Sequence, residues 1–224
     1  MAHVELGLDA RTNLEGEVQR DDHLRRWVGL GGLAFVVVLL ATVFATPNGP
    51  DTTATAAKVA AFAHQNRGGL YLSAYLISLA VLIAGALLWY LRDVVAPEHA
   101  GRRLANLGFA GGLLFLVGGL FSAGAAFAMA DVANHAEPSV LQTLNIFSQD
   151  VANMAGGATA LLLGATSLAI LRSRALPSWL AYVGLVLAVA SFAIPMLGLP
   201  IVGLWLLLTS VVILLTSRTP SITA

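Results

Sequence analysis

The sequence predicts an all-α polytopic membrane protein, a bundle of six transmembrane helices with both termini in the cytoplasm. The first observation is composition: 58% of the 224 residues are hydrophobic and only 11% are charged, whereas soluble domains carry roughly 25% charged residues. So few charges cannot cover the surface of a water-soluble domain, so we expect lipid to cover it. The second observation is a series of six apolar stretches, each near the roughly 20 residues that cross a bilayer.

The six predicted spans follow one another so closely that we expect a single membrane domain over residues 27–218. They cover residues of about 27–45, 69–91, 104–130, 151–171, 177–194 and 199–216. Before them, residues 1–26 are polar and of mixed charge and lack the apolar core of a signal peptide, which predicts a flexible cytoplasmic tail. The last two spans share one apolar run that Pro195 and Pro200 interrupt. A tight hairpin of two spans explains the prolines, and a re-entrant pair of half-spans is the alternative.

The positive charges assign an orientation to these spans. Of the twelve Lys and Arg residues, only Lys58 and Arg67 fall in segments on the outer side when the amino terminus is placed inside. The others are Arg11, Arg20, Arg25, Arg26, Arg92, Arg102, Arg103, Arg172, Arg174 and Arg218. Because cytoplasmic loops retain Lys and Arg, we expect a multi-pass plasma-membrane protein with both termini cytoplasmic. The inner arginines also form a basic rim that favours anionic lipid head groups.

The long loop between the first two spans contains a predicted helix at about residues 52–66. Asn48-Gly49-Pro50 is typical of a turn, Asp51 or Thr52 is a suitable helix cap, and Gly68-Gly69 ends the helix. The helix either packs over the bundle as an outer lid or lies on the membrane surface.

Small residues indicate where helices pack closely in lipid. In the fourth span Ala152, Gly156, Ala160 and Gly164 lie four residues apart, and the third span carries Gly108, Gly111, Gly112, Gly118 and Gly119. We expect these two spans to form the crowded centre of the bundle, and a homodimer through one of these faces is the alternative.

No motif for catalysis or cofactor binding stands out. The chain has no Cys, which excludes thiolate chemistry, and its net charge of zero offers no basic field for nucleic acid. No predicted span holds an acidic or basic residue near its middle, which disfavours an ion-coupled transporter. We therefore expect no enzymatic activity and no cofactor.

Polar residues gather at the outer ends of the third and fourth spans. Asn145, Gln149 and Asn153 share one helical face, with Asp150 beside them, and these four are the predicted ligand-binding residues. Their amides either bond to a neighbouring helix or orient the polar group of a lipid-like ligand.

A metal site is a second interpretation of the same region. His64, Asp131, His135 and Asp150 face one compartment and have the side chains that bind a divalent metal such as zinc. A hydrated helix end with ordinary capping is the alternative, since the spacing of the four residues is not diagnostic.

Four short stretches carry a resemblance to a known group of proteins. They are the run from Lys58 to Arg67, Leu72-Ser73-Ala74-Tyr75-Leu76, Phe147-Ser148-Gln149-Asp150, and Ala175-Leu176-Pro177-Ser178-Trp179-Leu180. In these the chain resembles a family of uncharacterised bacterial integral membrane proteins, common in actinobacteria. The resemblance implies six spans and a plasma-membrane location, and it implies no activity.

Taken together, the sequence predicts a protein that binds or transports a small hydrophobic or lipid-like molecule, which enters between the third and fourth spans. The partners expected are the bilayer, such a ligand and a second copy in a homodimer. Two other functions remain open at this point: a structural or accessory subunit of a membrane complex, and an intramembrane metal-dependent hydrolase that uses the His and Asp set.

Overall fold

The computed structural model describes residue 27 and residues 29–95, 99–194 and 197–216, and all regular structure in these ranges is helical. Four helices are long and apolar enough to cross a membrane. They are α3 (Arg67–Val95), α4 (His99–Val132), α5 (Pro138–Ser173) and α7 (Gly198–Thr216). Two apolar helices of less than 18 residues accompany them, Gly29–Ala45 and α6 (Ser178–Ala193), together with the short helix α2 (Ala56–Gln65). The chain is therefore a helical protein with several candidate membrane spans.

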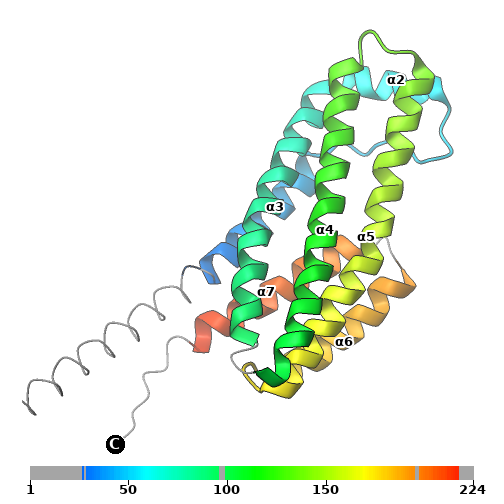
Figure 1. The fold of residues 1–224 in the computed structure, drawn as a ribbon. Helices are drawn as coiled ribbons and strands as arrows, with labels where there is room; N and C mark the ends of the chain where they lie inside the picture. Colours follow the sequence, from blue (N-terminus) through cyan, green and yellow to red (C-terminus); the bar gives the residue numbers. More distant parts are fainter. Residues whose placement is uncertain (1–26, 28, 96–98, 195–196, 217–224) are drawn as a thin grey trace, which may run out of the picture.

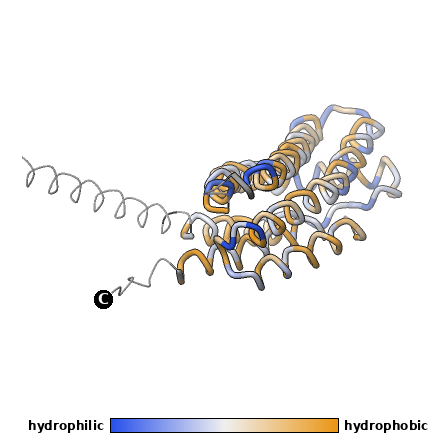
Figure 2. Tube along the Cα trace, turned by 60° about the horizontal axis from the view of Figure 1, so that its bottom comes forward, coloured by the Kyte–Doolittle hydropathy of each residue, from blue (hydrophilic) through white to orange (hydrophobic). Residues whose placement is uncertain are grey.

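The long helices α3, α4 and α5 lie side by side and antiparallel (Figure 1). At one end of this layer lie Arg92 in the last turn of α3, Arg102 and Arg103 near the start of α4, and Arg172 at the end of α5. We call this the arginine end. At the opposite end α2 crosses the tips of the long helices, and we call this the cap end. Hydrophobic residues dominate the helices between these two ends (Figure 2).

The helices α4 and α5 form the crowded centre of the bundle, as the glycines predict. A Cβ atom added to Gly111 would lie 2.6 Å from the backbone nitrogen of Leu162, a distance at which only glycine fits. Gly108 likewise lies directly against Thr166 of α5. The two backbones approach closely because α4 carries no side chain at these positions.

The small residues of α5 face other helices than the sequence suggests. A Cβ atom on Gly198, at the start of α7, would lie 3.3 Å from the Cα atom of Gly156, and one on Gly164 would lie 3.8 Å from Ala188 of α6. Gly156 and Gly164 are therefore used within the chain to pack the α6–α7 hairpin. Since Gly198 meets Gly156 near the middle of α5, the hairpin runs beside only the half of α5 nearer the arginine end (Figure 1).

Two buried polar groups meet where α5, α6 and α7 cross. The Oγ of Ser167 and the Nε1 of Trp205 are fully buried and have no hydrogen-bond partner among the described residues. Both border Gly184 of α6, whose added Cβ atom would lie 2.7 Å from Trp205 Nε1. Glycine is required here because α6 passes directly over the two side chains.

Helix α5 begins earlier than the sequence analysis expected. The predicted span began near residue 151, whereas residues 138–150 form the first turns of α5 and the connection to α4 is short. Pro138 occupies the first turn of the helix, where the missing N–H of proline costs no hydrogen bond. The predicted start near residue 151 followed the apolar stretch, and the helix extends beyond it with Asn145 and Gln149 on its polar face.

The cap end has a small core of its own, separate from the main one between the long helices. Val59 and Ala63 of α2 are fully buried against Met129 and Ala130 of α4 and Leu141 of α5. The lid predicted at residues 52–66 is thus a helix over Ala56–Gln65 that packs on the bundle. Its N-cap residue is Thr55, which makes no side-chain cap bond, so the predicted capping role of Asp51 or Thr52 is wrong.

Candidate functional site

Three amide side chains on one face of α5 hold the loop that precedes α2. Gln142 Nε2 donates to the carbonyl oxygen of Ala54 at 2.9 Å, and Asn145 Nδ2 donates to that of Pro50 at 3.2 Å. Gln149 Nε2 donates to the same Pro50 oxygen at 2.9 Å. The spacing of three and four residues places the amides one above another on the helix. Asn145 and Gln149, predicted as ligand-binding residues, therefore donate hydrogen bonds that fix the loop.

The other two predicted ligand-binding residues form no hydrogen bond to this loop. Asp150 and Asn153 are exposed on α5, and neither makes a side-chain hydrogen bond or ion pair within the described ranges. They lie between the loop at Pro50 and the tip of the α6–α7 hairpin, which contacts Gly156. Their role in ligand binding stays a prediction.

The four candidate metal ligands are spread over the cap end. His64 Nδ1 is 2.6 Å from Asn134 Oδ1, so this histidine connects α2 to the turn after α4. Asp131 Oδ1 accepts a hydrogen bond from the Tyr71 hydroxyl at 3.3 Å. His135 and Asp150 are exposed. Across the described ranges, which include all four residues, no three His, Cys, Asp or Glu side chains form a group suited to a metal ion.

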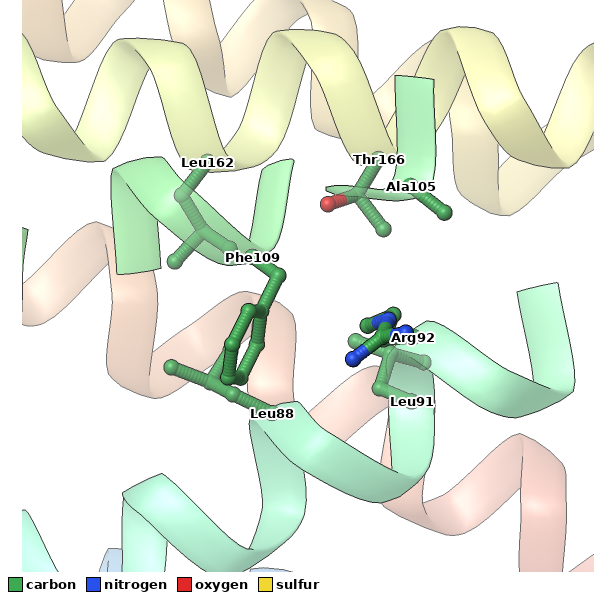
Figure 3. A pocket seen from close by; sticks show the side chains of 7 residues that line it. All are labelled: Leu88, Leu91, Arg92, Ala105, Phe109, Leu162 and Thr166. Carbon is green, nitrogen blue, oxygen red and sulfur yellow. The ribbon is translucent and has the colours of Figure 1, made fainter. Parts of the chain in front are cut away.

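A recess between the three long helices lies close to the arginine end. Leu88, Leu91 and Arg92 come from α3, Ala105 and Phe109 from α4, and Leu162 and Thr166 from α5 (Figure 3). Its cavity volume is about 10 Å³, about the space that one water molecule needs. Ligand pockets for whole drug-sized molecules start at about 300 Å³. A ligand would therefore contact the recess at its open side and would not lie within it.

Arg92 is the charged group of this recess, and aromatic rings hold its side chain in place. The guanidinium carbon lies 5.1 Å from the centre of the Trp89 ring and 5.7 Å from that of Phe109. The two rings themselves meet edge to face, with their centres 5.8 Å apart. Each cation–π contact stabilises by roughly 0.5–2 kcal/mol, so the guanidinium is oriented before any ligand arrives.

The guanidinium of Arg92 has few acidic partners. Its closest charged neighbour in the described chain is Asp93, whose Oδ1 lies 4.0 Å from Arg92 Nε, at the limit of an ion pair. The Asp93 side chain is 61% exposed, whereas that of Arg92 is 23% exposed. A partly buried guanidinium with free N–H donors is an unsatisfied site for an anion.

The sequence pattern places Arg92 only in the general basic rim and does not indicate the recess. The local signal was the spacing of Trp89 and Arg92, three residues apart at the end of an apolar helix, which places ring and charge on one face. The contribution of Phe109, Leu162 and Thr166 depends on how α3, α4 and α5 pack. No pattern within one helix contains that information.

Comparison with known proteins adds no assignment. No protein-family model, no characterised protein and no solved structure matches this chain.

Proposed function

We propose that the chain is a six-span protein of the plasma membrane that binds or passes a small hydrophobic or lipid-like molecule, with the recess at Arg92 as the binding site. The helices Gly29–Ala45 and α6 are the fifth and sixth spans beside the four longer ones. Both are apolar, and with a rise of about 1.5 Å per residue their lengths approach the hydrocarbon thickness of about 30 Å. The positive-inside rule places the arginine end in the cytoplasm.

The length of the long helices indicates where the outer boundary of the membrane would cross them. About 20 residues of helix cross the hydrocarbon, so counting from Arg103 and Arg172 places the outer boundary near Gly124 of α4 and Ala152 of α5. The hydrogen bond between Ser122 and Ser148, 3.0 Å long, holds these two levels side by side. In this arrangement the first turns of α5 and the cap project outward, and the recess opens at cytoplasmic membrane depth.

The observation that carries the proposal is the chemistry of the recess. Its walls are apolar apart from Arg92 and Thr166, and it lies between helices at a level that lipid reaches directly. A site with apolar walls and few polar groups is typical of ligand pockets. An amphiphile suits both the apolar walls and the charged Arg92, because its polar group meets the arginine while its chain stays in the hydrocarbon.

Native mass spectrometry in mild detergent tests this function. We expect the wild-type protein to retain an added mass of a few hundred daltons, and we expect Ala105→Phe to lose it. Ala105 is 2% exposed and lines the recess, so a phenyl ring there fills the space. The matched control is Leu114→Phe on the same helix, at a side chain that is 59% exposed. An added mass retained equally by Ala105→Phe would overturn the site, and a bare wild-type protein would overturn the function.

A structural or accessory subunit of a membrane complex is the second candidate. The small volume of the recess favours it, because most of the interior is tightly packed between α4 and α5. A bare protein that co-purifies with a stable partner at fixed stoichiometry would support this function. The dispersed positions of His64, Asp131, His135 and Asp150 give the metal-dependent hydrolase no support.

A further inference from the structure

We propose that the recess recognises an anionic amphiphile, with the Arg92 guanidinium as the ligand of its carboxylate or phosphate group. This inference rests on the proposed function and names the class of molecule bound. The alternative classes, neutral and zwitterionic amphiphiles, fit the apolar walls equally well. The distinction depends on the charge around the recess.

The charges near the recess favour an anion. Among the seven lining residues Arg92 is the only charged one, and its guanidinium has no hydrogen bond to the described residues. Arg102 precedes Ala105 by three residues and Phe109 by seven, which places it on the same face of α4, one turn toward the arginine end. An anion at the mouth of the recess would thus lie between two cations, with the exposed Asp93 as the nearest acid.

The orientation of Arg92 supports direct contact with the head group. The cation–π contacts with Trp89 and Phe109 hold the guanidinium in place, and a planar fork binds carboxylate and phosphate oxygens in pairs. Thr166 lies across the recess from Arg92 (Figure 3), and its hydroxyl packs against Gly108 of α4. Holding the donors in place before binding reduces the entropy lost on association.

The apolar surroundings of the recess favour a lipid over a soluble anion. Leu88, Leu91 and Leu162 form its walls. Leu113 follows Ala105 by eight residues, lies on the same side of α4 and is 44% exposed, so an acyl chain can follow the helix there. Basic pockets between membrane helices on the cytoplasmic side are suited to lipid head groups. A soluble anion would gain the charge interaction without the apolar contact.

The test compares lipids that share the same acyl chains. Phosphatidylglycerol and phosphatidylcholine are titrated separately into the full-length protein, and bound lipid is counted by native mass spectrometry. For the wild type we expect phosphatidylglycerol to bind about 10- to 100-fold more tightly, the range expected for a hydrogen bond to a charged group. Inorganic phosphate at millimolar concentration is added as a competitor and should not displace the lipid.

Two substitutions of Arg92 separate the effect of its charge on lipid binding from an effect on folding. Arg92→Gln should abolish the preference for phosphatidylglycerol while leaving phosphatidylcholine binding in place, and Arg92→Lys should retain part of the preference because it keeps the charge. Arg103→Gln is the matched control, since Arg103 is an exposed arginine that does not line the recess. Monodisperse elution of each variant shows that it folds, and Arg92→Lys gives the comparison where Arg92→Gln fails this check.

The outcomes distinguish failure of the anionic assignment from failure of the proposed function. Equal binding of both lipids by the wild type, or an equal preference in wild type and Arg92→Gln, would overturn the anionic assignment while the proposed function stands. Displacement by inorganic phosphate would overturn the lipid as the ligand in favour of a soluble anion. Binding of neither lipid, with Ala105→Phe identical to wild type, would overturn the proposed function as well.

Discussion

The side chain of Gln149 donates a hydrogen bond of 2.9 Å to the carbonyl oxygen of Pro50, across 99 positions of the chain. This contact gives the polar face of α5 a structural role. Asn145 bonds to the same oxygen and Gln142 bonds to Ala54, so the loop before α2 is attached to α5 at two places. The cap therefore depends on Gln142 and on two residues, Asn145 and Gln149, whose amides the sequence left open to either a ligand or another part of the chain.

Gln149→Leu should loosen this loop. The substitution leaves the Pro50 carbonyl with one amide donor instead of two and should cost about 0.5–1.5 kcal/mol. Limited proteolysis of the protein in detergent, with cleavage sites mapped between Pro50 and Thr55, measures the effect. Asn153→Leu changes an exposed amide on the same face with no partner in the described chain and should leave the cleavage rate unchanged. Equal cleavage of both variants and wild type would show that the contact does not hold the loop.

Gly111→Ala should destabilise the bundle. Its new Cβ atom would lie 2.6 Å from the backbone nitrogen of Leu162, so α4 and α5 must separate, at a cost of about 1–3 kcal/mol. Gly124→Ala in the same helix is the control, because an added Cβ atom there meets nothing within 4 Å. That change should raise stability slightly, since alanine favours helix. Thermal unfolding in detergent compares the two, and equal melting temperatures would contradict the close packing.

Ser167→Ala should be neutral or stabilising. The Ser167 hydroxyl is fully buried and has no hydrogen-bond partner among the described residues, and such a group costs about 1–3 kcal/mol. Ser191→Ala in α6 is the comparison, because its buried hydroxyl donates to the Ala188 carbonyl at 3.0 Å. We expect the melting temperature of Ser167→Ala to equal or exceed that of Ser191→Ala. A clear loss of stability confined to Ser167→Ala would show that its hydroxyl has a bonding partner.

The loop at Asp51 should respond to acid. The hydroxyl and amide of Thr53 donate to Asp51 Oδ1 at 2.8 and 3.0 Å, and the hydroxyl bond is the main reason that the pKa of Asp51 lies below its ordinary value of 3.8. A carboxyl group whose pKa is lowered by folding stabilises the folded state above its unfolded pKa. That contribution is lost as the pH falls from about 3.8 through the lower, folded value. Loop proteolysis by an acid-active protease should therefore rise below this pH in wild type and change less in Asp51→Asn.

Much of the fold follows from local patterns in the sequence. Apolar stretches between arginines and prolines predict where helices occur, because a helix in lipid must be long and apolar. The glycines of α4 predict close packing, since Gly108 and Gly111 leave room for a neighbour. Which neighbour fills that room is a tertiary property, and so the contacts of Gly156 with α7 and Gly164 with α6 were not predicted.

The candidate site was less predictable, for two physical reasons. A polar face on a helix has the same sequence pattern whether it binds a ligand or the chain's own loop, so Asn145 and Gln149 were ambiguous. The recess at Arg92 requires side chains from three helices whose relative register is fixed by packing. Only the Trp89–Arg92 spacing was visible along the chain, and by itself it indicates a membrane boundary as readily as a binding site.

Photolabelling with an anionic lipid that carries a diazirine near its head group tests the central claim most directly. After irradiation in the membrane, labelled residues are mapped by peptide mass spectrometry. We predict labels concentrated on Leu88–Arg92 of α3 and Ala105–Phe109 of α4, lost in Ala105→Phe and retained in Leu114→Phe. Labels spread evenly over the exposed faces of all helices, and unchanged in Ala105→Phe, would contradict a binding site at this recess.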